Sequence, residues 1–110
     1  MEEHISCTAR LWRWTGGKDG KGGAWHFLTI AGKPAEVLAG TALMRRLDGS
    51  SRGFGSLRVS ATISETTWQT SVFPEKSATD APEWLLPVKA AVRKAEHLDE
   101  GDEAALDLLF

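Results

Sequence analysis

The sequence predicts a mainly β fold, in which six short strands and two helices form a small barrel or a strongly curled sheet. Three observations support this class. Apolar and polar residues alternate over residues 57–63 and 68–73, as they do in strands with one buried face. A similar alternation runs over residues 4–14. Two other segments, which follow Pro34 and Pro87, carry apolar residues at helical spacing instead.

The composition fits one globular domain over residues 1–110, because 110 residues are too few for two cores. With 42% hydrophobic residues and a net charge of −2, the chain is not a disordered one. Charged residues interrupt its most apolar stretch, residues 81–95, which argues against a membrane span. The chain begins without a signal-peptide core, and Cys7 is its only cysteine. We therefore expect a cytoplasmic protein without an internal disulfide.

The first half begins with two strands. In residues 4–14 the odd positions are apolar up to Leu11, whereas Trp12 and Trp14 fall on the opposite parity. This switch predicts a bulge or a sharp coil near Arg10–Leu11. Five glycines within residues 16–23 predict a flexible loop, and residues 24–30 form the next strand.

A helix and a hairpin follow. The helix is expected from about Gly32, with Pro34 in its first turn, to Arg46. The alternation then predicts a hairpin with Ile63 opposite Trp68, a register that also places Ser71 opposite Ser60. A slip by one residue would move a whole apolar face to solvent, and the burial pattern argues against such a slip.

The last third is expected to hold a short strand, a helix and a terminal strand. Pro74 is predicted to end the hairpin, and residues 75–80 to form a polar loop. After a strand over residues 83–86, Pro87 is predicted to begin the second helix. A turn over residues 99–102 leads into a strand that ends at the C-terminus.

The sequence contains no pattern typical of a metal, cofactor or catalytic site. Residues 16–21 resemble a phosphate-binding loop but lack its spacing and its Ser or Thr. The three histidines are far apart along the chain and no Cys-x-x-Cys pair occurs, so we predict no metal and no cofactor. Ser71 does not lie in a nucleophile-elbow motif.

A nucleic-acid interface is a weaker possibility. Residues 1–60 hold nine basic and five acidic side chains, whereas residues 61–110 hold four and ten. Arg52-Gly53-Phe54-Gly55 matches the start of an RNA-recognition signature, but the stacking aromatics that should follow are absent. The basic residues that such an interface would use are Arg10, Arg13, Arg45, Arg46, Arg52 and Arg58.

Tryptophan is unusually frequent, with five residues and no tyrosine. Trp25 and Trp68 lie within predicted strands and are expected in the core. Trp12, Trp14 and Trp84 lie near predicted strand ends, where a large ring can line the mouth of a pocket, although a core position is the better expectation for each.

Several motifs together resemble the DUF1905 family. They are Trp68-Gln69-Thr70-Ser71-Val72-Phe73-Pro74, Leu85-Leu86-Pro87-Val88-Lys89, Val92-Arg93-Lys94-Ala95, Gly101-Asp102, Trp25-x-Phe27 and Gly53-Phe54-Gly55. The resemblance implies a small closed six-stranded barrel of the double-split kind with helices packed on its ends. The family has no assigned activity and supplies no catalytic residues.

Two details of the C-terminal half leave alternatives open. Gly101 is expected to allow a positive φ in the last turn, and Asp102 to bond the backbone of that turn. Arg93 either pairs with a carboxylate such as Asp102 or Glu83, or holds an anionic ligand. The strand–helix–strand tail also looks like that of the AbrB/MazE type of DNA-binding barrel, although this half of the chain is acidic.

These observations favour a non-enzymatic binding module for a small molecule or a protein partner, as a monomer or a homodimer with no membrane contact. Nucleic-acid binding is the alternative, and a small-molecule enzyme without a visible motif is the second. The binding residues that the sequence suggests are Trp25, Arg58, Trp68, Ser71, Phe73 and Arg93.

Overall fold

The computed structural model describes residues 3–15, 24–47, 49, 55–76 and 81–110. In these residues the elements follow the predicted order. They are β1 (His4–Thr15), β2 (Ala24–Ile30), α1 (Gly32–Leu47), β3 (Leu57–Ile63), β4 (Thr66–Lys76), β5 (Pro82–Pro87), α2 (Ala90–Ala95) and β6 (Glu103–Leu109). The predicted glycine-rich loop over residues 16–23 and the Arg52-Gly53-Phe54 motif lie outside the described residues.

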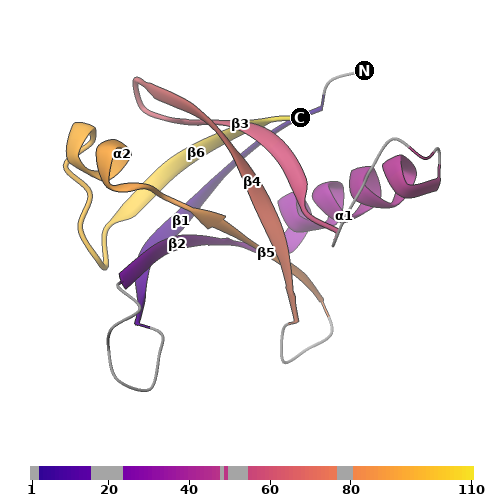
Figure 1. The fold of residues 1–110 in the computed structure, drawn as a ribbon, viewed down its shortest axis with the longest axis horizontal. Helices are drawn as coiled ribbons and strands as arrows, with labels where there is room; N and C mark the ends of the chain where they lie inside the picture. Colours follow the sequence, from indigo (N-terminus) through magenta and orange to yellow (C-terminus); the bar gives the residue numbers. More distant parts are fainter. Residues whose placement is uncertain (1–2, 16–23, 48, 50–54, 77–80) are drawn as a thin grey trace.

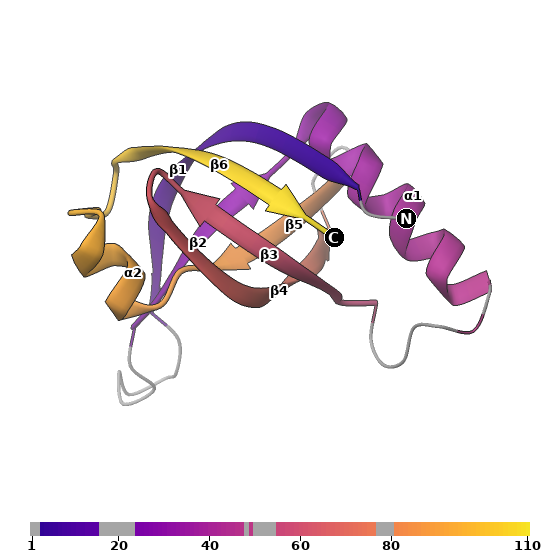
Figure 2. The same ribbon diagram turned by 90° about the horizontal axis from the view of Figure 1, so that it is seen from above.

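The strands close into a barrel in the order β1-β2-β5-β4-β3-β6, and each neighbouring pair is antiparallel. The two helices lie at opposite ends of the barrel (Figure 1), and the view from above shows the strands surrounding a common core (Figure 2). The predicted fold class, mainly β with a closed six-stranded barrel, is confirmed. No helix in the described part of the chain is long and apolar enough to span a membrane.

Strand β1 pairs with two different strands along its length. It pairs with β6 as far as Arg10, opposite Glu103, and with β2 from Leu11, opposite Leu28. No extra residue interrupts either register, so the predicted bulge near Arg10–Leu11 is wrong. The parity of the apolar residues changes because Trp12 and Trp14 lie on the outer face of the barrel, beyond the point at which β1 changes partner.

The turn of the β3–β4 hairpin lies one residue earlier than predicted. Ile63 lies opposite Thr66, and Ala61, not Ile63, lies opposite Trp68. The turn consists of Ser64 and Glu65, with a φ of 54° at Ser64. Two-residue turns of this kind suit the twist of paired strands. The predicted register is wrong by an even number of residues, so the same side chains still face the core, and alternation alone does not separate the two registers.

Two prolines lie within strands, although the sequence predicted that Pro74 ends a strand and that Pro87 begins a helix. Strand β4 continues through Pro74, which pairs with Trp84. Pro87 is the last residue of β5 and lies opposite Phe27, so it does not begin α2. The chain stays extended beyond Pro87 because the backbone N–H of Val88 donates to the carbonyl of His26, at 2.9 Å. A proline fits a strand wherever the ladder does not need its missing N–H.

The core fills the barrel, and each helix contributes to one end of it. Its most deeply buried side chains are Leu11, Leu28, Ile30, Leu38, Val72, Leu86, Val92, Leu106 and Leu108. Helix α1 contributes Leu38 and lies against β5 and β1, whereas α2 contributes Val92. The last turn is as predicted: Gly101 has a φ of 95°, and the Asp102 carboxylate accepts a hydrogen bond from the Asp99 N–H at 2.8 Å.

Candidate functional site

The outer face of β1, β2 and β5 carries rows of large apolar side chains. Trp14 lies opposite Trp25 and Trp12 opposite Phe27, which in turn lies opposite Pro87. Trp25 is 54% exposed, so its predicted core position is wrong. In β2 the core side is occupied by Leu28 and Ile30. Because side chains alternate along a strand, Trp25 and Phe27 must face outward.

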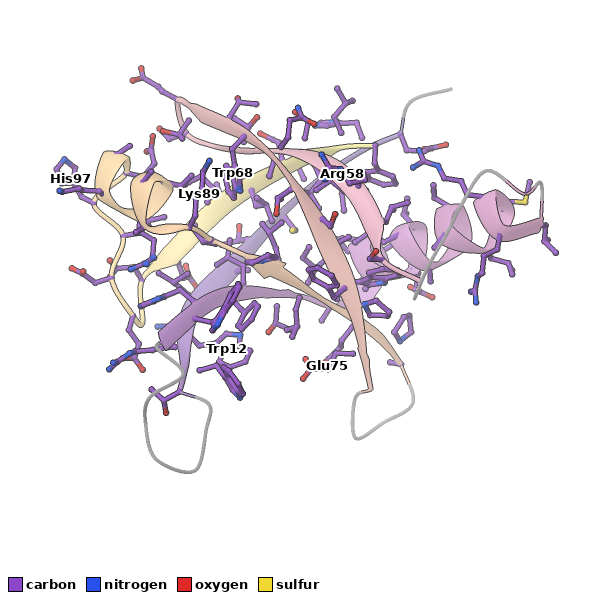
Figure 3. All side chains as sticks on the ribbon, viewed as in Figure 1. Trp12, Arg58, Trp68, Glu75, Lys89 and His97 are labelled. Atoms are coloured by element: carbon purple, nitrogen blue, oxygen red, sulfur yellow. The ribbon has the colours of Figure 1, made fainter. Side chains whose placement is uncertain are left out.

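A pocket of about 410 Å³ opens at the end of the barrel near α2. The residues that define this mouth pocket for the argument below are Trp25, His26, Trp68, Gln69, Lys89 and Arg93. Strand β2 supplies Trp25 and His26, β4 supplies Trp68 and Gln69, and the segment after β5 supplies the two cations. Figure 3 shows Trp68 and Lys89 beside each other near α2. Trp68 is 7% exposed, as expected for a core residue, and its ring also forms part of the pocket wall.

The two cations of the mouth pocket have no carboxylate partner among the described residues, where the ion pairs join His4 to Asp107 and Arg10 to Glu103. Arg93 Nε donates to the carbonyl of Val88 at 3.2 Å, which holds the side chain against the chain segment between β5 and α2.

The predicted ion pair between Arg93 and an internal carboxylate is therefore not formed. The Asp102 carboxylate bonds the backbone of its own turn, and Glu83 lies opposite Glu75 in the β4–β5 ladder. The Asp102 carboxylate is therefore engaged within its own turn, and no ion pair joins Glu83 to Arg93 among the described residues.

His26 lies at the base of this charged region. Its Nδ1 is buried and has no hydrogen-bond partner. Burial lowers the pKa of His26, the positive charges of Arg93 and Arg13 lower it further, and Glu100 opposes them. A buried ring nitrogen without a hydrogen-bond partner is costly.

The lowered pKa of His26 has a measurable effect on stability. As pH falls below the ordinary histidine pKa of about 6.5, the unfolded chain takes up a proton that the folded chain resists, so the free energy of unfolding decreases. We expect His26→Gln to remove this contribution, which urea unfolding at stepwise lower pH would measure. His97→Gln, a change at an exposed residue, should keep the wild-type dependence; equal slopes for wild type and His26→Gln would contradict the assignment.

A second hollow of about 400 Å³, the aromatic groove, lies on the outer face of the barrel next to the mouth pocket. It is lined by Trp12, Trp14, Trp25, Phe27, Phe73, Glu75, Leu85 and Pro87. The rings of Trp25 and Phe27 stack with their centroids 6.2 Å apart, and the ring centroids of Trp12 and Phe27 are 5.3 Å apart. Trp12 Nε1 donates to Thr29 Oγ1 at 2.8 Å, which fixes that indole.

Of the six residues that the sequence suggested for binding, four line one or both hollows and two line neither. Trp25, Trp68 and Arg93 line the mouth pocket, and Trp25 and Phe73 line the aromatic groove. Arg58 and Ser71 lie opposite each other on β3 and β4 and line neither hollow.

Arg58 and Ser71 therefore form a separate pair. Arg58 is far from Lys89 in Figure 3. Ser71 was predicted opposite Ser60, which is wrong, because Ser60 faces Gln69 and accepts a hydrogen bond from it at 3.0 Å.

Of the arginines considered for nucleic acid, Arg52 lies outside the described residues, and the other five line neither hollow. Arg10 donates to the carbonyl of Gly101 at 2.8 Å and pairs with Glu103. Arg45 and Arg46 are in the last turn of α1. Among the described residues, no group of three His, Cys, Asp or Glu side chains is placed to hold a metal ion.

A family model for a domain of unknown function, DUF1905, matches residues 8–108. The chain belongs to the DUF1905 family. The match covers nearly the whole chain and includes both hollows, so they are parts of the DUF1905 domain itself. No curated protein matches the sequence significantly.

Sequence reasoning missed three residues of the DUF1905 mouth pocket, which are His26, Gln69 and Lys89. None of the three was among the binding residues that the sequence suggested. The alternation with Leu28 could have placed His26 on the inner side of β2. Lys89 is brought to the pocket because Pro87 remains in β5, whereas the sequence predicted that Pro87 begins the second helix.

Proposed function

We propose that this DUF1905 domain is a non-enzymatic binding module, whose mouth pocket holds a small anion with a flat apolar part. One observation carries the proposal: Lys89 and Arg93 share a pocket with two indoles and have no carboxylate partner among the described residues. The lone cysteine, Cys7, whose thiol pKa is raised by burial and by Asp107, supports a cytoplasmic location for the domain.

Each group in the pocket has a distinct part in holding such a ligand. The guanidinium of Arg93 can bind two oxygens of a carboxylate or phosphate at once, and Lys89 adds a second positive charge. The faces of Trp25 and Trp68 offer contact area to a flat ring. Gln69 supplies a polar contact that fixes orientation.

Phenyl phosphate is a suitable probe because it joins a flat ring to a phosphate. We expect saturable binding by isothermal titration calorimetry. The dissociation constant should rise about tenfold in Arg93→Gln, since a hydrogen bond to a charged group contributes roughly 1.5–3 kcal/mol. Lys89→Gln should weaken binding to a lesser degree, because the lysine acts as a point charge without a fixed fork.

Lys94→Gln is the matched control, because it removes the same charge from the exposed surface of α2 without altering the mouth pocket. It should change the dissociation constant by less than about twofold. Urea unfolding of each variant would verify that Arg93→Gln still folds. The absence of saturable binding to the folded wild type, or equal weakening by Lys94→Gln and Arg93→Gln, would overturn the proposal.

A further inference from the structure

We propose that the aromatic groove is a second binding site, and that it takes a methylated or quaternary ammonium group. The proposal concerns a different ligand class from that of the mouth pocket and does not depend on the proposed function. The two hollows share only the side chains of Trp25 and Pro87.

The groove has two walls and a floor. Indoles and a phenyl ring on β1 and β2 form one wall, of which Trp14 and Trp25 are the most exposed. Phe73 and Glu75 on β4 form the other. The floor is Leu85 with Pro87 on β5, the strand that pairs with both β2 and β4. An occupant would therefore touch rings on two sides and an apolar surface beneath.

The charges that line the aromatic groove favour a cation as its ligand. No Lys or Arg among the described residues lines the groove, whereas the carboxylate of Glu75 does. Glu75 makes no ion pair with the described residues, and its cross-strand neighbour in β5 is Glu83, a second carboxylate. Figure 3 shows Glu75 and Trp12 on the same side of the barrel. The negative faces of the aromatic rings also attract a cation, so the rings and the Glu75 carboxylate favour the same charge on a ligand.

The apolar lining selects the kind of cation. A bare ammonium group needs hydrogen-bond acceptors to replace its water, and apart from Glu75 the groove is lined by apolar side chains. Methyl groups on the nitrogen spread the charge over an apolar surface, which can contact ring faces and Leu85 without losing hydrogen bonds. Such a group is carried by small molecules and also by methylated lysine side chains of proteins.

Choline and its neutral isostere 3,3-dimethyl-1-butanol separate charge from shape, because they differ in the central atom of the head group. We expect choline to move the NMR signals of the Trp14 and Trp25 indole N–H groups in a saturable way. The neutral isostere should bind about tenfold more weakly. A peptide with trimethyl-lysine, compared with the unmodified peptide, would show whether a protein-borne group binds more tightly than the free cation.

Substitutions in the aromatic groove test whether choline binds there. Trp14→Ala should weaken choline binding about tenfold, and Glu75→Gln several-fold. Glu36→Gln is the matched control on an exposed position of α1, and Arg93→Gln tests independence from the mouth pocket; both should leave choline binding unchanged. Equal affinities for choline and the isostere, no movement of the indole signals, or equal effects of Glu75→Gln and Glu36→Gln would overturn the proposal.

Discussion

Replacing Trp84 by alanine is expected to lower the free energy of unfolding by about 3–5 kcal/mol, the usual cost of removing a large aromatic side chain from a core. Trp84 is 4% exposed and lies in the middle of β5, opposite Ile30 on one side and Pro74 on the other. Helix α1 also packs on β5. The loss would therefore leave a cavity that neither strand nor helix can easily fill.

Urea unfolding followed by circular dichroism measures this cost. Trp14→Ala is the control, because Trp14 is 47% exposed and its removal should cost less than about 1 kcal/mol. Trp84→Phe should retain most of the stability, since it keeps a ring in the same place. If the Trp14 and Trp84 variants lost equal stability, the placement of Trp84 in the core would be wrong.

The second large effect is expected from Leu28→Ala, at about 2–5 kcal/mol. Leu28 lies between Leu11 of β1 and Leu86 of β5 in one row across the barrel, and all three side chains are fully buried. A cavity at the centre of this row would remove contacts from both neighbours at once.

Leu109→Ala provides the matched comparison for Leu28→Ala. It deletes the same atoms at a residue that is 40% exposed, near the end of β6, and should cost much less. The same urea experiment gives both values. A Leu28 variant as stable as the Leu109 variant would show that the row across β1, β2 and β5 is not part of the core.

Much of the fold follows from local pattern. The element order and the buried sides of β3 and β6 are readable because one side chain in two faces the core. The hairpin register was not readable, since shifts by two residues keep the same face buried. The ends of β4 and β5 were predicted wrongly for a different reason. Pro74 and Pro87 each pair with a residue of a neighbouring strand, and such tertiary pairing is not visible in the local sequence.

The candidate site was predictable only in part. Trp68 and Arg93 were named from the sequence, and the structure places both at the mouth pocket. Lys89 reaches the same pocket through the path of the chain after β5, which no local pattern encodes, whereas the inward side of His26 follows from the alternation of β2. Trp25 was assigned to the interior because large aromatic rings usually lie there, whereas strand alternation places it outside.

The closure of the barrel has a consequence for how this domain can meet other macromolecules. Each described strand has a neighbour on both sides, although several strands, such as β1, pair with one neighbour along one part of their length and with the other neighbour along another part. An incoming segment, or a second copy of the chain, therefore finds no strand that lies wholly at the edge of an open sheet. Recognition is then expected to depend mainly on the identity of the outward-facing side chains. Point substitutions on the outer surface can then alter what the domain recognises while the barrel keeps its form.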